Sequence, residues 1–188
     1  MKQEPETLTF KSAKAFDLWL ASNYQHEPGV WVKVAKVSSG IPSITSDELV
    51  DVGLCWGWIS GQRKSLNNSY YLQKYVPRRP RSIWSQVNVD KVETLTKAGK
   101  MQLPGIKQVK EAKVDGRWQA AYASQRNAVV PADLVQALAK NKAAADRFKL
   151  LNKTDRYAII MKLEIQRNPE GRAALLNKLV LAMANQKS

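Results

Sequence analysis

The stretch WISGQRKSLNNSYYLQKYV, residues 58–76, decides the fold because it reads as two strands joined by a turn. Its halves, WISGQRK and YYLQKYV, flank the segment LNNS, and paired asparagines tolerate the positive φ angles of tight turns. We therefore predict a β-hairpin with strands at 58–64 and 70–76.

A third strand precedes the hairpin. The run VWVKVAKV, residues 30–37, is rich in valine and alternates so that Val30, Val32 and Val34 face one way. Together with the hairpin, it predicts a small antiparallel sheet of about three strands with helices covering one side. The predicted fold class of this part of the chain is α+β.

Two helices are expected on either side of the first strand. Ser12 can cap the first helix, which stops near Asn23 and has apolar residues at helical spacing. Thr45 and Glu48 have the spacing of a capping box, so a second helix is expected over about 46–55.

The chain beyond the hairpin is predicted to be helical. Pro77 and Pro80 end the last strand because proline cannot donate to the ladder, and a helix is expected from about Ser82 to Ala98. Pro104 opens another short helix, and after Trp118 the pattern is wholly helical. The expected starts of the C-terminal helices are Pro131 at a first helical position and the caps Asn141, Thr154 and Asn168. We predict an α+β domain at 1–126 and an all-helical domain at 127–188.

The net charge of +14 is concentrated in the middle of the chain. Residues 1–59 carry 5 Lys and Arg against 7 Asp and Glu, whereas residues 60–126 carry 14 against 4. Residues 127–188 carry 11 against 5. A segment with this excess of cations repels itself unless counterions, phosphates or an acidic partner lie nearby. The alternative is the ordinary solvated surface of a basic protein.

Several classes of protein are excluded or disfavoured by what the sequence lacks. The start has no apolar signal-peptide core and no apolar run reaches membrane-span length, so we expect a cytoplasmic protein without a membrane partner. His26 lies in a turn, and Cys55 lies among apolar residues as a small hydrophobe with a raised pKa. One histidine and one cysteine exclude a conventional zinc site, and the common nucleotide-phosphate loops are absent. No catalytic residue, metal or cofactor is predicted.

A basic and aromatic constellation remains as the candidate ligand-binding site. Arginine meets phosphate or carboxylate with a planar fork of donors, and Arg81 and Ser82 stand at the start of the expected helix, where unpaired N–H groups favour anions. The arginines could instead cover apolar surface or pair with the acidic N-terminal segment, and the aromatic residues could be ordinary core. The candidate ligand-binding residues are Trp58, Ser60, Arg63, Arg78, Arg79, Arg81, Trp84, Ser85 and Asn88.

Four motifs carry a family resemblance: LCWGWISG from residue 54, VPRRPRSIWSQVN from 76, LTKAGKM from 95 and VKEAKVDGRW from 109. Taken in order over roughly residues 8–120, they resemble the YdeI/OmpD-associated, or bacteriocin-protection, family of bacterial proteins. The helices after PADLVQAL look like the tail domain of that family. The resemblance implies an α+β domain followed by helices and no assigned biochemical activity. Family members usually carry aspartate where this chain has Ser60.

Three functions are compatible with these residues. The first is a binding module for an anionic ligand, with nucleic acid or another polyanion as partner, in which Arg78, Arg79 and Arg81 contact phosphates and Trp58 or Trp84 offers a stacking face. The second is an enzyme or lapsed enzyme with a small phosphorylated or carboxylated ligand, in a pocket lined by Trp58, Ser60, Arg79, Trp84 and Asn88. The third is an interaction protein that recognises an acidic protein partner.

Overall fold

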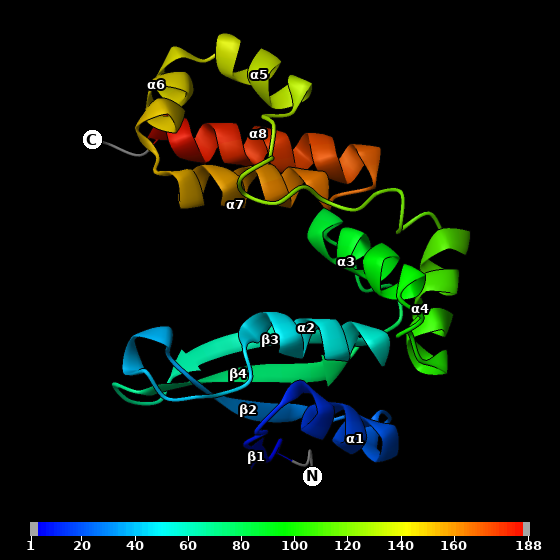
Figure 1. Ribbon diagram of the computed structural model, residues 1–188. Coiled ribbons are helices and arrows are strands. Elements are labelled where there is room, and N and C mark those ends of the chain that lie inside the picture. The colour runs from blue at the N-terminus through cyan, green and yellow to red at the C-terminus, as the bar shows by residue number, and fades with distance from the viewer. Residues whose placement is uncertain (1–3, 186–188) are drawn as a thin grey trace. The chain divides into compact units, whose positions relative to one another are not determined.

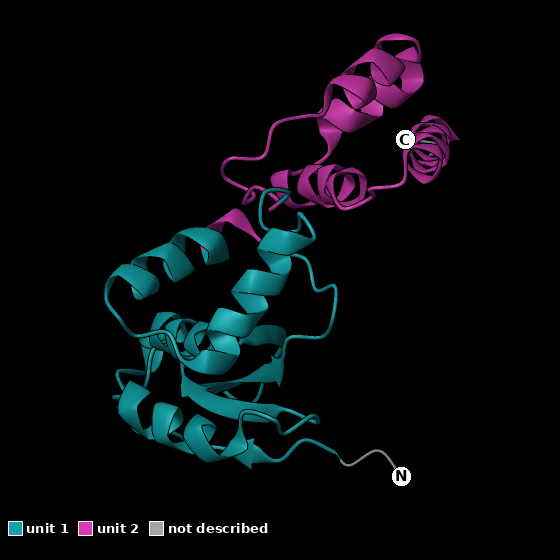
Figure 2. Ribbon diagram, turned by 90° about the vertical axis from the view of Figure 1, so that its right-hand side faces the viewer, with its two compact units in different colours: residues 1–84, 88–120 teal, residues 85–87, 121–188 magenta. Residues whose placement is uncertain are grey.

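The computed structural model describes residues 4–185. The chain divides into two compact units (Figure 2): unit 1 contains residues 1–84 and 88–120, and unit 2 contains residues 85–87 and 121–188. Unit 1 holds a sheet with helices, and the C-terminal region is all helical (Figure 1). The α+β class predicted from the sequence is confirmed.

The sheet of unit 1 has the order β1-β2-β4-β3. Strands β2 (Val30–Ala35), β3 (Trp58–Ser65) and β4 (Tyr70–Pro77) pair antiparallel as predicted. A fourth strand, β1 (Thr7–Leu8), pairs parallel with β2, so the sheet is mixed. The sequence did not reveal β1, because two residues are too few to show an alternation.

The hairpin turn is closed by a side chain. The Asn67 Oδ1 accepts hydrogen bonds from the backbone N–H groups of Ser69 and Tyr70, at 3.0 and 2.9 Å. Neither asparagine has a positive φ, because Arg81 is the only such non-glycine residue between positions 4 and 185. The hairpin prediction is confirmed, but the reason given for the turn was wrong: asparagine acts here through its side chain and not through its backbone.

A β-bulge divides strand β3. Ser60 lies opposite Tyr75 and Arg63 opposite Gln73, so β3 has one more residue than β4 between these pairs. Tyr75 and Gln73 are two residues apart and point to one face of β4, so their partners Ser60 and Arg63 share a face although they are three residues apart. Arg63 therefore faces the same side as Trp58 and Ser60, and Lys64 faces the opposite side.

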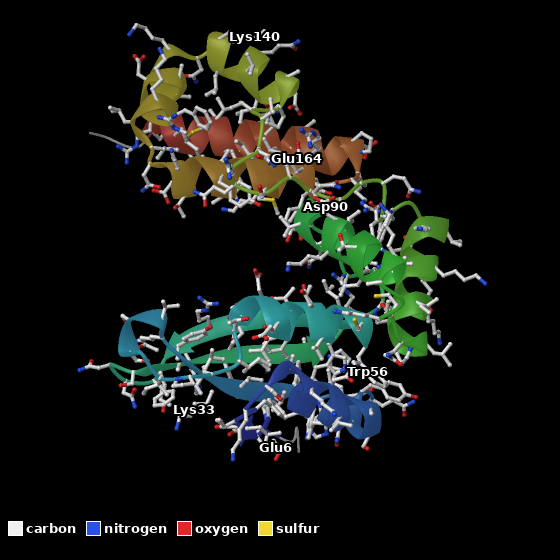
Figure 3. The ribbon with its side chains drawn as sticks, viewed as in Figure 1. Glu6, Lys33, Trp56, Asp90, Lys140 and Glu164 are labelled. Atoms are coloured by element: carbon white, nitrogen blue, oxygen red, sulfur yellow. The ribbon has the colours of Figure 1, made fainter. Side chains whose placement is uncertain are left out.

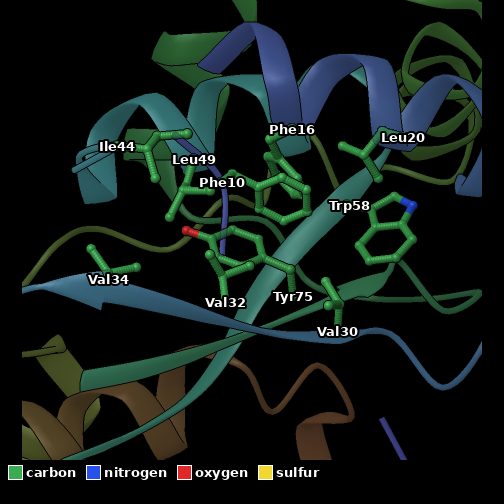
Figure 4. Close-up of a cluster of buried hydrophobic side chains, with 10 residues drawn as sticks. All are labelled: Phe10, Phe16, Leu20, Val30, Val32, Val34, Ile44, Leu49, Trp58 and Tyr75. Atoms are coloured by element: carbon green, nitrogen blue, oxygen red, sulfur yellow. The ribbon is translucent and has the colours of Figure 1, made fainter. Parts of the chain in front are cut away.

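Helices α1 (Ala13–Asn23) and α2 (Ser46–Cys55) cover one face of the sheet. Ser12 caps α1, and Thr45 with Glu48 forms the expected capping box on α2. Figure 4 shows the core between these helices and the strands. It contains Phe10, Phe16, Leu20, Val30, Val32, Val34, Ile44, Leu49, Trp58 and Tyr75.

Two more helices complete unit 1. Helix α3 (Gln86–Lys97) begins at Gln86, so the predicted start at Ser82 was wrong. Arg81 has a φ of 66°, which breaks the helical path, and the carbonyl of Ser82 accepts a hydrogen bond from the Arg117 guanidinium at 2.9 Å. Helix α4 (Leu103–Val114) has proline in its first turn, as predicted.

Unit 2 is built from α5 (Ala132–Ala139), α6 (Lys142–Leu150), α7 (Lys153–Glu164) and α8 (Pro169–Asn185). Its core is formed by Leu134, Leu138, Ala144, Phe148, Leu163, Val180 and Met183. Asn141 caps α6 and Asn168 binds the first turn of α8, as predicted. Asn152, and not Thr154, caps α7, and Pro131 is the N-cap of α5 instead of its first helical residue.

Candidate functional site

The two tryptophans predicted to bind a ligand are buried. Trp58 is fully buried, and its Nε1 donates a hydrogen bond to the Tyr24 carbonyl at 2.8 Å. Trp84 is 2% exposed, and its ring centroid lies 4.9 Å from that of Trp118. Neither residue offers a stacking face to a base, because packing inside unit 1 already covers both.

The three neighbouring arginines do not share one environment. Arg78 is 5% exposed, and the carbon of its guanidinium lies 3.5 Å from the Trp84 ring centroid. It donates a hydrogen bond to the Ile83 carbonyl at 3.2 Å, so it stabilises the loop between β4 and α3. Arg79 and Arg81 are exposed, and the N-terminus of α3 is not at Arg81 as the sequence suggested.

The remaining polar candidates are also spread out. Ser60 is exposed on β3. Asn88 is half-buried on α3 in unit 1, whereas Ser85 belongs to unit 2, where it forms a β-bridge with Tyr122. Trp58 packs against Trp19 and Trp84 packs against Trp118. None of the five residues proposed for an enzyme site lines any of the four main cavities formed by residues 4–185.

Arg63 is the predicted residue whose geometry best suits an anion. Its Nε donates to the Gln73 Oε1 at 2.9 Å, and its terminal nitrogen donates to the Ser46 Oγ at 3.2 Å. Its guanidinium also lies over the Tyr71 ring, 4.4 Å from the centroid. Gln73 is itself buried and donates to two carbonyls of β3. The guanidinium is therefore held in one orientation by neutral groups.

A second basic surface, not predicted from the sequence, lies on the face of the sheet opposite α1 and α2. We call it the lysine–aromatic face; Lys33 of β2 is labelled in Figure 3. The Lys33 ammonium lies 4.2 Å from the Tyr70 ring centroid, and those of Lys64 and Lys74 lie 4.3 and 5.8 Å from the Trp31 centroid. The lysine–aromatic face is defined by Trp31, Lys33, Lys64, Tyr70 and Lys74.

Strand pairing explains this arrangement. Trp31 lies opposite Lys74, and Lys33 and Lys64 both lie opposite Leu72, so the three strands project these side chains to one face. Lys64 is exposed and the other four residues are half-buried. The side chains that alternation places here on β2, β3 and β4 include no carboxylate. The alternation that predicts Val30, Val32 and Val34 on the core side of β2 also predicts that Trp31 and Lys33 point to the other side. This pattern could have revealed the lysine–aromatic face from the sequence.

Within residues 4–185, no three His, Cys, Asp or Glu side chains lie close enough to hold a metal ion. The ring of His26, half-buried in its turn, meets Trp19 edge-on with centroids 6.2 Å apart. Helices in this part of the chain are too short or too polar to cross a bilayer.

Cys55 is expected to be a poor nucleophile, as its apolar neighbours suggested. Burial, with smaller contributions from Asp17 and Asp51, raises the pKa of its thiol to about 11. At pH 8 only about 0.1% would be thiolate, whereas a free cysteine would be roughly a quarter ionised. We expect an aromatic disulfide reagent to label the native protein at least about a hundredfold more slowly than the urea-unfolded protein. Equal rates would contradict the burial of this thiol.

Two family models match this chain. Residues 8–108 match a family described as "Domain of unknown function (DUF8412)". Residues 127–186 match the family described as "Bacteriocin-protection, YdeI or OmpD-Associated", which confirms the resemblance seen in the sequence. That match covers the C-terminal helices, whereas most of the motifs that suggested it lie before residue 120. A search of curated proteins and one of solved structures gave no match. The chain therefore belongs to the family described as DUF8412, and its helical C-terminal part matches the model of the bacteriocin-protection, YdeI or OmpD-associated family.

Proposed function

We propose that unit 1 binds single-stranded nucleic acid on the lysine–aromatic face. One observation carries the proposal: on the face of the sheet opposite α1 and α2, Trp31 lies beneath two lysine ammonium groups and Tyr70 beneath one, without a carboxylate among these side chains. Aromatic rings on a sheet stack unpaired bases, and cations beside them neutralise the phosphates. Bases in a duplex are stacked on each other and are not available to these rings, so a single strand is the better partner.

Displacement of the lysines from the rings is favourable. A cation–π contact at an exposed site contributes about 0.5–1 kcal/mol, whereas stacking of a base on an aromatic side chain contributes about 1–3 kcal/mol. An incoming base would therefore replace the ammonium over Trp31 or Tyr70. The long lysine side chains would then reach the phosphates on either side of the base, so that both contacts are gained together.

The two rings would take separate bases. Trp31 lies opposite Lys74 and Tyr70 opposite Ala35, so the rings are offset by four residues along the strand pair, about 14 Å at the rise of an antiparallel strand. Lys33 lies between these positions, opposite Leu72. This arrangement suits an extended strand of several nucleotides better than a free nucleotide.

A charge-reversal experiment tests the proposal. Fluorescence anisotropy with a labelled oligothymidylate of about 12 nucleotides, within the site sizes of single-strand binders, would measure affinity. With three phosphate contacts, affinity should fall about 20-fold between 50 and 200 mM salt. The double variant K33E/K74E should bind at least about tenfold more weakly at 50 mM and lose roughly 1.4 from the slope of log affinity against log salt.

The matched control changes the same charge elsewhere in unit 1. Lys11 and Lys14 are exposed near the start of α1, and K11E/K14E should bind within about twofold of the wild type. If both double variants weaken binding equally, net charge and not this face is responsible. If poly-L-glutamate binds as tightly as the oligonucleotide, base stacking makes no contribution and an acidic protein becomes the better partner.

A further inference from the structure

A cavity of about 910 Å³ is lined by Arg63, whose side chain points to the helix side of the sheet. The end of β2, the segment 36–46 and strand β3 line it, and we call it the Arg63 cavity. Its apolar lining includes Val34, Ile41 and Ile44. Its volume is within the range of small-molecule sites, roughly 300–1,000 Å³. It is open to solvent, since Val37 and Ile41 in its lining are exposed, so a small organic ligand would keep one side in water.

The charged residues that line the Arg63 cavity are all cations. They are Lys36, Arg63 and Lys64, and no aspartate or glutamate is among the lining residues. The ammonium of Lys36 is held by the Asn67 carbonyl at 2.7 Å, and that of Lys64 lies over Trp31 on the opposite face. Arg63 therefore offers the cavity its planar fork of donors, and Lys36 adds a second positive charge whose hydrogen-bond partners are neutral.

Three other cations with ordered side chains are neutralised by a carboxylate, whereas Arg63 is not. Lys91 pairs with Asp51, Arg117 with Asp115 and Arg172 with Asp133, each at 2.7 Å. Within residues 4–185, Arg63 forms no such ion pair; its partners are the neutral Gln73 and Ser46. These contacts fix the guanidinium without neutralising it, so an anion would meet a donor that is already oriented.

We propose that the Arg63 cavity binds a small organic anion, with a carboxylate or phosphate head on Arg63 and an apolar body against Val34, Ile41 and Ile44. The planar guanidinium suits either head, because both accept its forked donors. The apolar lining favours a hydrocarbon or aromatic body over a sugar, whose hydroxyls would be left without partners. This site shares Lys64 with the lysine–aromatic face, but neither its proposed anion-binding residue, Arg63, nor its apolar lining belongs to that face.

Isothermal titration calorimetry with 4-phenylbutyrate tests the charge requirement. The matched alcohol 4-phenylbutanol has the same apolar body without the charge, and it should bind at least about tenfold more weakly, the effect of one hydrogen bond to a charged group. A separate titration with phenyl phosphate distinguishes the two head groups. If phenyl phosphate binds more tightly per apolar atom than 4-phenylbutyrate, phosphate is the preferred head group of the cavity. If the alcohol binds as tightly as the carboxylate, the proposal is overturned.

Two variants test whether the anion binds at Arg63. R63Q removes the charge and should weaken phenylbutyrate binding at least about tenfold, whereas R79Q removes one exposed charge outside the cavity and should bind within about twofold of wild type. Equal loss in both variants would contradict the assignment. On the wild-type protein, amide resonances of Ile41, of residues 43–46 and of residues 63–65 should move on titration, and shifts confined to other regions would also overturn the proposal.

The same ligand separates this proposal from the nucleic-acid site. K33E/K74E changes residues that do not line the Arg63 cavity, so it should bind phenylbutyrate like the wild type. If K33E/K74E loses oligonucleotide binding and keeps phenylbutyrate binding, the result supports two sites. If R63Q loses phenylbutyrate binding and keeps oligonucleotide binding, the result supports the Arg63 cavity.

Discussion

Alanine at Gly29 is expected to lower the free energy of unfolding of unit 1 by about 3–5 kcal/mol, a large part of the roughly 5–15 kcal/mol of an ordinary domain. Gly29 has a φ of 71°, and a Cβ there would lie 2.3 Å from the Tyr75 carbonyl oxygen and 2.5 Å from a Val76 methyl carbon. The first clash is with the backbone of β4, which pairs with β2 and cannot move without breaking the sheet. The cost therefore exceeds the roughly 1 kcal/mol of an alanine in an open left-handed position.

Gly40 is the matched control. It has nearly the same φ, 67°, but a Cβ there would meet no atom within 4 Å. We expect G40A to cost only about 1 kcal/mol. Equilibrium urea unfolding, followed by tryptophan fluorescence, would compare the two variants. Equal losses would mean that conformational strain, and not the contact with β4, governs Gly29.

Alanine at Gly105 is expected to cost about 3 kcal/mol or more, although alanine favours helices over glycine by about 1 kcal/mol. Gly105 lies in α4 where this helix meets the end of α2, and a Cβ there would lie 2.1 Å from the Cys55 carbonyl oxygen. The Leu54 carbonyl oxygen would be 2.8 Å away. All these atoms are backbone, so the two helices would have to move apart, and the hydrogen bond from Gln102 N to Cys55 O would be lost.

A second helical glycine gives the opposite expectation. Gly53 lies in α2, and a Cβ there would make ordinary contacts of 3.5–3.7 Å with Tyr75 and Trp58. Its φ is not in the left-handed region, so G53A should be neutral or should stabilise the protein by up to about 1 kcal/mol. Calorimetric or urea unfolding of both variants would show the contrast; a loss at Gly53 as large as that at Gly105 would refute it.

Local signals predicted most of the fold. The capping box of Thr45 and Glu48 and the cap at Ser12 depend on residues three apart, and both formed as expected. Asn152 and Thr154 are both residue types that cap helices, and residue type alone does not show which of them caps α7. The structure shows that Asn152 is the N-cap. Strand β1 owes its existence to pairing with β2, a contact between distant residues that leaves no local signal.

The candidate site was harder to predict, because composition does not reveal which side chains contact each other. Arg78 and Trp84 were both expected to bind a ligand, yet they bind one another across a loop whose path depends on the positive φ of Arg81. Arginine at a left-handed position has no clear sequence signature. By contrast, Arg63 was correctly placed on a strand, but its orientation depends on a bulge that the alternation did not show.

That bulge keeps the two basic side chains of β3 on their faces although the strand carries an extra residue. Ser60 and Arg63 are three residues apart, and regular alternation would turn them to opposite faces; across the bulge, Arg63 points to the helix side with Ser60 and Lys64 points to the outer side. Deletion of Gln62 would leave Ser60 and Arg63 two residues apart on a regular strand, so Arg63 would still lie opposite Gln73 and Lys64 opposite Leu72. The hairpin can therefore lose this residue without exchanging the guanidinium and the ammonium between the two faces of the sheet.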